Sequence, residues 1–310
     1  MTLSERPLIS IVIPSYNQGR YIRETIDSVL EQDYRPIEVL VFDGASNDET
    51  VDVLKSYDVP ELQWWSERDR GVVDAVNKGL VRARGDIVAI QSSDDVYVPG
   101  ALAAVVDAFR EIPGLGLVYG DVEYIDADSC VGGRTYLPPF TLHEYVGKLN
   151  YIPQPAAFFT AEAMRATGEW RADISYAADA EFFLRIAMRF SVKKLDRILA
   201  RYRYHDEQRD QAAERIVRDW HTAIEPLTRS SDRRLRRYAR SSIDLTRIRY
   251  TPDSQWLRRT IAAYHALMIN PAVIRSAEFR AIRDLLPARY PIWRLLSQIK
   301  RRLGFRPRSS

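Results

Sequence analysis

The chain has 310 residues, of which 46% are hydrophobic and 28% charged, and it contains one cysteine. This composition is typical of a globular protein, and the lone Cys130 excludes an internal disulfide framework and a cysteine metal cluster. The net charge of +3 conceals an asymmetry: residues 1–196 hold 19 Lys and Arg against 31 Asp and Glu, whereas residues 197–310 hold 26 against 11. The basic part is therefore either a solvated helical surface or a surface attracted to phosphates.

The first hundred residues alternate between short β-branched apolar runs and segments with helical spacing. We expect Asn17 to be the N-cap of the first helix. The order β-α-β-α-β-α-β indicates a parallel sheet with helices on its faces. The predicted strands are 8–14, 37–44, 62–67 and 86–92, and the predicted helices are 17–32, 47–57 and 71–85.

The pattern becomes mixed beyond residue 100 and reads as helices only from about residue 212. We therefore expect an α/β domain over residues 1–210 and an arginine-rich helical region over residues 211–310. Between them lie predicted helices at 99–112 and 177–190 and predicted strands at 115–125, 155–160 and 197–204.

Carboxylates stand at the ends of the predicted strands, where ligands bind in parallel sheets. The adjacent pair Asp94 and Asp95 follows the fourth strand, and no nearby lysine or arginine compensates it. Carboxylates can hold a diphosphate through Mg²⁺ or Mn²⁺, so the pair predicts a metal and nucleotide-sugar site. The alternative is an acidic turn that caps the following segment, VYVPG. The sequence contains no GxGxxG after the first strand, no P-loop, no HExxH and no GxSxG.

Three stretches resemble the successive motifs of bacterial family 2 glycosyltransferases, which have a GT-A fold, a Rossmann-like nucleotide-sugar-binding sheet with helices on both faces. They are ISIVIPSYNQGRYIRETIDSVLEQDYRPIEVLVFDGASNDET, WWSERDRGVVDAVNKGLVRARGDIVAIQSSDD and QPAAFF…GEW…AADAEFFLRIA…YRYH. The resemblance covers residues 8–207. It implies inverting transfer of a sugar from a UDP- or dTDP-sugar to a hydroxyl of a saccharide or lipid-linked saccharide, in cell-surface polysaccharide or glycolipid synthesis.

The first motifs imply contacts with the donor. The resemblance places Pro14, Tyr16 and Asn17 under the base and ribose. Asp43 resembles the aspartate that hydrogen-bonds the base, and Ser46 lies nearby in DGASND.

The next motifs resemble the segment beside the base and diphosphate. Asp69 and Asp74 are the donor-binding candidates there, together with Lys78, although Lys78 and Asn77 could instead only order the loop. Asp48 is either a second donor contact or the N-cap of a helix.

In the SSDD run, Asp95 matches the metal ligand of the family and Asp94 the residue that contacts ribose or sugar. The first position of this DxD-like triplet is Ser93, which departs from the fuller form of the motif. His205 in YRYH is either a second metal ligand or an ordinary hydrogen-bonded histidine.

The segment AADAEFFLRI resembles the one that bears the catalytic base, which assigns that role to Asp179. Ala178 stands where many relatives have Glu, so a helper carboxylate is missing from that position. Glu181 either supplies it or is a surface residue of an amphipathic helix. A carboxylate base is sufficient for inversion, because it takes the proton of the attacking hydroxyl.

Two other classes of protein remain open. A sugar-phosphate nucleotidyltransferase would favour a glycine-rich basic loop after the first strand, and PSYNQGRY supplies one glycine. A non-catalytic nucleotide-sugar-binding or scaffold module would leave the carboxylates idle, and the presence of Asp43, Asp95 and Asp179 speaks against it. We expect no nucleic-acid partner, because no RNP-like, zinc-finger or helix-turn-helix pattern accompanies the arginines.

The C-terminal sequence RYPIWRLLSQIKRRLGFRPRSS (289–310) would carry an apolar stripe with a cationic rim if it were helical. We expect it to attach the protein to anionic lipids at the inner face of the cell membrane, or else to pack on the sheet domain or on a second subunit. The N-terminus MTLSERPLIS has no signal segment, and no apolar run reaches the ~20 residues that a membrane span needs, so a cytoplasmic location is expected.

Overall fold

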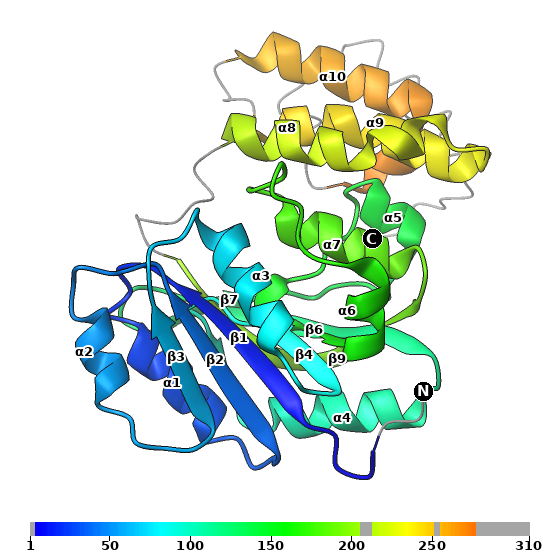
Figure 1. Cartoon of the computed structure of the whole chain (residues 1–310). Coiled ribbons are helices and arrows are strands. Elements are labelled where there is room, and N and C mark those ends of the chain that lie inside the picture. Colours follow the sequence, from blue (N-terminus) through cyan, green and yellow to red (C-terminus); the bar gives the residue numbers. More distant parts are fainter. Residues whose placement is uncertain (1–3, 205–212, 251–254, 277–310) are drawn as a thin grey trace, which may run out of the picture. The chain divides into compact units, whose positions relative to one another are not determined.

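The structure is a computed structural model that describes residues 4–204, 213–250 and 255–276 (Figure 1). The described residues form two compact units. The first unit runs to Ala223 without Val146–Leu149, and the second unit contains Val146–Leu149 and the described residues from Ile224 onward. The domain boundary predicted at residue 210 lies outside the described residues.

The first unit is built on a nine-stranded sheet of the described residues in the order β3-β2-β1-β4-β8-β6-β9-β5, with β7 paired to β6. The four predicted strands of the first hundred residues are present as β1–β4 and pair in parallel. β8 is antiparallel to both β4 and β6. The strands are β1 (Ile9–Ser15), β2 (Ile37–Asp43), β3 (Leu62–Ser66), β4 (Ile87–Ile90), β5 (Val96–Tyr97), β6 (Leu115–Ile125), β7 (Val131–Arg134), β8 (Ala157–Thr160) and β9 (Ser191–Arg203).

Helices cover both faces of this sheet, because each strand alternates apolar residues between two buried faces. One core joins Ile11 of β1 to Ile26 of α1 and Val105 of α4, and α3 packs on the other face against Val12 of β1. The helices of the first unit are α1 (Ile22–Leu30), α2 (Thr50–Lys55), α3 (Val72–Arg82), α4 (Ala101–Glu111), α5 (Leu142–Val146), α6 (Ala161–Thr167), α7 (Ala178–Ala187) and α8 (Ala213–Ile224), the last residues of α5 and α8 falling in the second unit.

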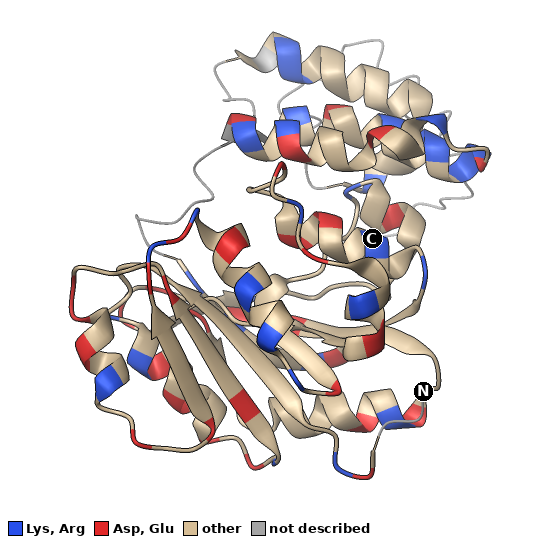
Figure 2. Cartoon of the chain, viewed as in Figure 1, with Lys and Arg blue, Asp and Glu red and all other residues tan. Residues whose placement is uncertain are grey.

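The described part of the second unit is helical. It contains η3 (Glu225–Arg229), α9 (Arg233–Tyr250), α10 (Trp256–Ile269) and η5 (Pro271–Arg275). A small core that includes Leu245, Ile248 and Leu267 joins α9 to α10. Ribbon segments coloured blue for Lys and Arg recur along α9 (Figure 2). No helix among the described residues is long and apolar enough to cross a membrane.

Candidate functional site

The carboxyl ends of three parallel strands are held in register. Ser15 of β1 is the partner of Asp43 of β2, and Asp43 is the partner of Ser66 of β3. The Asp43 carboxylate is buried; its Oδ2 accepts hydrogen bonds from Ser46 N at 3.0 Å and Ser66 Oγ at 2.6 Å, and its Oδ1 accepts from the Ser46 hydroxyl. Asp43 therefore fixes the turn that follows β2, at the edge where the sequence predicts the base of the donor.

The turn after β1 is tied to this one. Asn17 N donates to Ser46 Oγ at 2.7 Å, and Asn17 Oδ1 accepts from Asn47 N at 3.0 Å. Asn17 has φ 52°, which asparagine tolerates better than most residues. The prediction that Asn17 caps the first helix is wrong, since α1 begins at Ile22.

Asp48 bonds to backbone on both sides. Its Oδ1 accepts from Thr50 N at 3.0 Å, at the start of α2, and its Oδ2 accepts from Gly19 N at 2.9 Å. These bonds lower the pKa of Asp48 despite its partial burial. The side chain thus serves as a local cap and as a link between the two turns.

Tyr16 and Asp69 both lie against the backbone of Gly44. A Cβ at Gly44 would come within 3.0 Å of Asp69 Oδ2 and 3.3 Å of Tyr16 Cδ2. Tyr16 is exposed, while Pro14 two residues earlier is buried in β1. Asp69 Oδ1 accepts from Gly71 N at 2.8 Å, ahead of α3. The structure therefore brings three predicted donor-binding segments together at one edge of the sheet.

Asp74 and Lys78 belong to a charged network on α3. Arg70 Nη2 lies 2.8 Å from Asp74 Oδ1, and Lys78 Nζ lies 3.5 Å from Asp74 Oδ2 and 2.9 Å from Glu67 Oε1. The hydrogen bonds that Asp74 accepts from Arg70 lower the pKa of Asp74, so its carboxylate is ionised near neutral pH. The neighbouring Asn77 exchanges two 2.9 Å hydrogen bonds with the backbone of Trp170 and so anchors the GEW segment.

The SSDD run forms a turn in which Asp95 N donates to Ser92 O at 3.2 Å. Ser92 Oγ donates to Gln154 Oε1 at 3.0 Å, which joins the turn to η1 (Gln154–Ala156). Asp94 is partly exposed, whereas Ser93 and Asp95 are buried. The two aspartates therefore occupy different environments although they are adjacent.

Arg203 at the end of β9 supplies the positive charge that the SSDD run lacks. Its backbone N donates to Asp95 Oδ1 at 2.9 Å and its Nε donates to Asp94 O at 2.8 Å. The guanidinium is fully buried and also lies 2.6 Å from Glu24 Oε2. Sequence analysis did not identify this residue; its only signal is its position in YRYH, beside the predicted metal ligand His205, which lies outside the described residues.

The second carboxylate oxygen of Asp95 is available. Asp95 Oδ2 is buried and has no hydrogen-bond partner among the described residues. Burial, and then the neighbouring Asp94, raise the pKa of Asp95 well above its usual value. A cation at this oxygen would favour the ionised form, so Asp95 fits the metal predicted for it. The described residues contain no cluster of three or more His, Cys, Asp or Glu that could hold a metal by itself.

Asp179 lies in the first turn of α7, and two contacts anchor that turn. Tyr145 OH donates to Ala180 O at 2.9 Å, and Asp219 Oδ2 on α8 accepts from the backbone N of Ser175 and of Tyr176, each at 2.8 Å. Burial and then the charge of Asp179 raise the pKa of Tyr145 well above its ordinary value. Sequence analysis missed Asp219, because it stands 40 residues after Asp179, the residue whose helix its contacts precede.

Glu181 is buried rather than exposed, so its interpretation as a surface residue is wrong. Its Oε1 accepts from Arg185 Nε at 2.8 Å. Arg185 in turn donates to the backbone carbonyl of Glu169 at 2.8 Å. Glu181 therefore carries a structural ion pair, although its Oε2 has no hydrogen-bond partner among the described residues.

Sequence comparisons identify relatives of known class. Residues 10–162 match the family model described as glycosyl transferase family 2. An uncharacterized glycosyltransferase of Mycobacterium tuberculosis is 33% identical over 190 residues, which are 60% of this chain and 71% of that protein. Chondroitin synthase of Escherichia coli is 29% identical over 208 residues, which are 66% of this chain and 30% of that protein.

Two solved structures share the fold. Residues 1–349 of Staphylococcus aureus TarS in complex with UDP-GlcNAc superpose with a TM-score of 0.62 at 14% identity, covering 89% of this chain and 90% of that one. The mannosyltransferase PcManGT from Pyrobaculum calidifontis, in complex with GDP-Man and Mn²⁺, gives 0.61 at 20% identity, covering 97% of this chain and 86% of that one.

Proposed function

The chain belongs to glycosyl transferase family 2, and on that premise we propose that it transfers a sugar from a UDP- or dTDP-sugar to a hydroxyl with inversion at the anomeric carbon. The acceptor is a saccharide or lipid-linked saccharide of a cell-surface polysaccharide or glycolipid. The two neighbours of known structure were solved in complex with different donors, UDP-GlcNAc and GDP-Man, so the choice of nucleobase rests on the motif resemblance. Measuring which members of a panel of nucleotide sugars the protein hydrolyses tests this choice of nucleobase.

The hydrogen bonding of the Asp95 carboxylate is the main support for this proposal. One of its oxygens is held by Arg203 N, and the other is buried with no hydrogen-bond partner among the described residues. The residue stands at the end of the sheet where Asp43 also lies, so the donor diphosphate and base would bind along one edge.

Asp95 would hold a divalent Mg²⁺ or Mn²⁺, with the donor phosphates as its remaining oxygen ligands. When bound, the cation stabilises the negative charge that develops on the leaving nucleotide diphosphate. PcManGT, which has the same fold, is titled as a complex with Mn²⁺. Arg203 holds the SSDD turn through its bond to Asp94 O. The carboxylate of Asp95 therefore need not reorganise when the donor binds.

Asp179 would take the proton from the acceptor hydroxyl as that oxygen attacks the anomeric carbon. Its helix is held by Tyr145 and Asp219, which fixes the carboxylate at the start of α7. Glu181 is the weaker candidate, because Arg185 already engages one of its oxygens. A carboxylate base of this kind contributes about 10²–10⁴-fold to the rate.

Conversion of Asp179 to Asn tests the base. Asp179→Asn keeps the size of the side chain but cannot accept the proton, so kcat should fall at least ~10²-fold while donor affinity stays within a few-fold. Glu181→Gln is the matched control and should cost much less in kcat at 25 °C. An exchange of these two phenotypes would make Glu181 the base, and full activity in both variants would refute a carboxylate base.

We also propose that residues 289–310, which lie outside the described residues, attach the protein to the inner face of the cell membrane. The support is their sequence, which alternates apolar residues with Lys300, Arg301 and Arg302. A lipid-linked acceptor would be presented at that surface. Replacement of these three residues by Gln in the full chain should weaken binding to anionic vesicles.

A further inference from the structure

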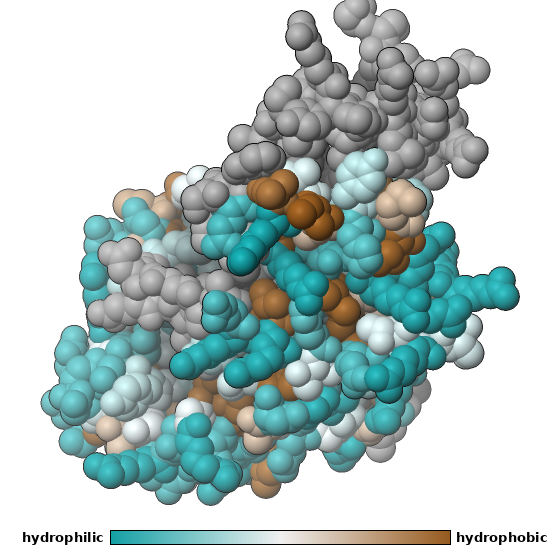
Figure 3. All heavy atoms as spheres, turned by 90° about the horizontal axis from the view of Figure 1, so that it is seen from above, coloured by the Kyte–Doolittle hydropathy of each residue, from teal (hydrophilic) through white to brown (hydrophobic). Residues whose placement is uncertain are grey.

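One face of α10 exposes a row of large apolar side chains. Leu257, Ile261, Tyr264 and Met268 are 57%, 62%, 38% and 65% exposed, and their spacing of four, three and four residues puts them in one stripe. The opposite side of α10 is buried against α9 through Ala263, Ala266 and Leu267. Exposed apolar side chains lie among polar ones on the face seen in Figure 3. A stripe of this regularity is typical of an interaction surface.

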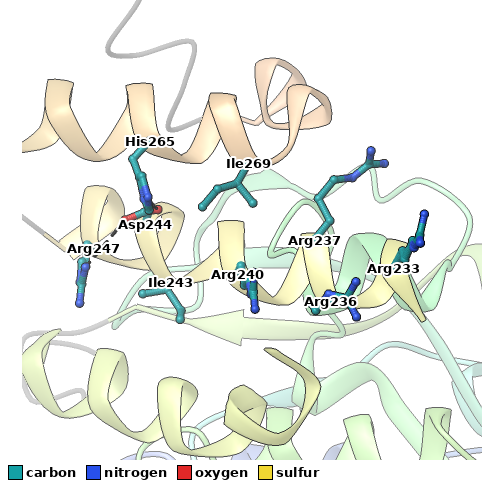
Figure 4. A pocket seen from close by; sticks show the side chains of 9 residues that line it. All are labelled: Arg233, Arg236, Arg237, Arg240, Ile243, Asp244, Arg247, His265 and Ile269. Atoms are coloured by element: carbon teal, nitrogen blue, oxygen red, sulfur yellow. Dashed lines mark hydrogen bonds and ion pairs between the residues drawn. The ribbon is translucent and has the colours of Figure 1, made fainter. Parts of the chain in front are cut away.

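One face of α9 carries a row of arginines that lines a pocket of about 580 Å³ (Figure 4). Relative to the first of them they stand at three, four, seven and fourteen positions, which places them on one face of the helix. Their side chains fan out along α9 rather than meeting at one point, and His265 reaches toward the row from α10 (Figure 4). The arginines of the row are Arg233, Arg236, Arg237, Arg240 and Arg247.

Most arginines of this row have no carboxylate partner among the described residues. Asp244 is the one acidic residue that lines the pocket, and its carboxylate is engaged by His265 Nδ1 at 2.6 Å and by Arg247 at 3.8 Å. Arg233 and Arg237 have no carboxylate partner among the described residues, and Arg240 donates to the carbonyl of Thr228 at 3.1 Å. The exposed members of the row are therefore accessible to anions from outside.

The stripe and the arginine row belong to one rigid pair of helices. Besides the apolar core, Asn270 Nδ2 donates to Ser241 Oγ at 3.2 Å, and His265 on α10 bonds Asp244 on α9. Both Ser241 and Asn270 are fully buried. The apolar and cationic surfaces therefore move together.

We propose that the α9–α10 pair is a docking surface for anionic phospholipid membranes. The apolar stripe of α10 enters the interface, and the arginine row of α9 binds lipid phosphates. The row extends over 14 residues, or roughly 21 Å of helix at about 1.5 Å per residue, which suits several headgroups rather than one small anion. The inference extends the proposed membrane attachment to a second surface and does not depend on residues 289–310.

Vesicle flotation of the full chain tests the proposal. The wild type should float with vesicles of phosphatidylcholine and phosphatidylglycerol but not with pure phosphatidylcholine. The triple variant Arg233→Gln, Arg237→Gln and Arg240→Gln should bind the anionic vesicles about 100-fold more weakly, and the pair Ile261→Asn and Met268→Gln at least tenfold more weakly.

Matched controls remove the same kind of residue elsewhere. Arg6→Gln, Arg110→Gln and Arg165→Gln remove three exposed arginines of the first unit, and Val81→Asn with Met188→Gln removes two exposed apolar side chains. Both controls should float like the wild type. Replacement of Lys300, Arg301 and Arg302 by Gln isolates the tail: loss of flotation only in that variant would leave the tail proposal standing and overturn this one.

Other occupants of the surface give different results, and each would overturn the proposal. Unchanged flotation with a lowered thermal midpoint in the α10 pair would mean that the stripe is covered by the rest of the chain. If flotation is unchanged, but the wild type is a dimer that the α10 pair dissociates, the stripe is a subunit interface. Binding of inorganic pyrophosphate to the arginine row without any flotation would make the row a site for soluble phosphates. Hydrolysis of the donor should be equal in all variants, so a failure of the proposed sugar transfer is seen separately.

Discussion

Arg203 has a fully buried guanidinium whose contacts come from three separate segments of the chain. They include Asp94 O, Asp126 O at 2.9 Å and Glu24 Oε2, and the Tyr21 ring lies 4.8 Å from the guanidinium carbon. A planar group with five donors can satisfy such a set, whereas the single ammonium of a lysine cannot. The acidity of the SSDD turn is therefore balanced by a residue 108 positions away from Asp95.

Loss of this guanidinium should destabilise the protein and loosen the turn. Arg203→Gln leaves the carbonyls of Asp94 and Asp126 without these donors and breaks the ion pair with the partly exposed Glu24, so we expect a loss of about 2–4 kcal/mol in unfolding free energy, measured by urea denaturation. Lys at this position should not restore it. Arg201→Gln on the same strand removes a partly exposed pair with Glu123 and should cost less than about 1 kcal/mol. Equal urea midpoints for the two variants would contradict the role given to Arg203.

Glu38 provides a pH-dependent contribution to stability at the other end of β2. Burial alone would raise its pKa, but bonds from the Ser10 hydroxyl and from Arg84 N at 2.7 Å and Arg84 Nη2 at 2.8 Å outweigh it, so the pKa of Glu38 is lowered. Because the folded-state pKa is the lower one, the stabilisation is present above the unfolded pKa of about 4.3 and is lost as pH falls through the folded value.

Glu38→Gln should therefore be less stable than the wild type at pH 7, by about 1–3 kcal/mol, and the difference should shrink below about pH 4. Thermal unfolding between pH 3 and pH 7 measures it. Glu61→Gln, which alters a looser 3.7 Å pair with Arg35, should show a much smaller difference at every pH. A gap between Glu38→Gln and wild type that widens on acidification would refute the assigned pKa direction.

At the scale of elements, the packing of α3 on β1 depends on a missing side chain. A Cβ at Gly79 would lie 2.2 Å from Val12 Cγ1, so helix and strand approach more closely than an alanine permits. Gly79→Ala should cost about 1–3 kcal/mol despite its better helix propensity, as measured by chemical denaturation. Gly132→Ala on β7, where no atom lies within 4 Å, is the control and should be nearly neutral. A stabilised Gly79→Ala would show that α3 can move outward freely.

The elements that sequence analysis predicted are those whose pattern is complete within the segment. The continuous apolar runs gave β1–β4, and the run at 115–125 coincides with β6. β5 and β7 were not predicted. The two residues of β5 carry no periodicity and their partner β9 lies far along the chain, whereas β7 is the short exposed segment VGGR, which has no alternating apolar pattern although it pairs with the preceding strand β6. The likeness to TarS and PcManGT confirms the predicted GT-A fold.

The residues of the candidate site also fall into two groups, those that the sequence predicted and those that it did not. Asp43, Asp94, Asp95 and Asp179 could be named from motifs, because short continuous segments carry them, at strand ends for the first three and at the start of α7 for Asp179. Arg203 and Asp219 could not, since each acts on residues more than 40 positions away, through contacts that only the folded chain creates.

At the scale of the whole molecule, binding of the nucleotide donor and sugar transfer should both depend on the divalent metal ion. EDTA should abolish transfer, and Mg²⁺ or Mn²⁺ should restore it. Asp95→Asn keeps an acceptor for Arg203 N, so the protein should fold, but calorimetric affinity for the nucleotide in the presence of Mn²⁺ should fall at least tenfold. Wild-type affinity in EDTA serves as the reference. Full transfer in EDTA, or metal-dependent affinity that survives in Asp95→Asn, would remove Asp95 from the metal site.

The hydrogen bonds of Asp219 set a limit on how this chain can be divided or recombined. The family match ends at residue 162, and a junction at residue 210 would look natural from composition, yet Asp219 lies beyond both and holds the backbone that leads into α7. A chimera joined at residue 210 would pair α7 with a foreign α8, whereas one joined at residue 162 would place both helices on a foreign sheet. A junction after Ala223, where the first unit ends, keeps Asp219 and Ser175 in the same parent. The exchangeable catalytic module is therefore longer than its family signature.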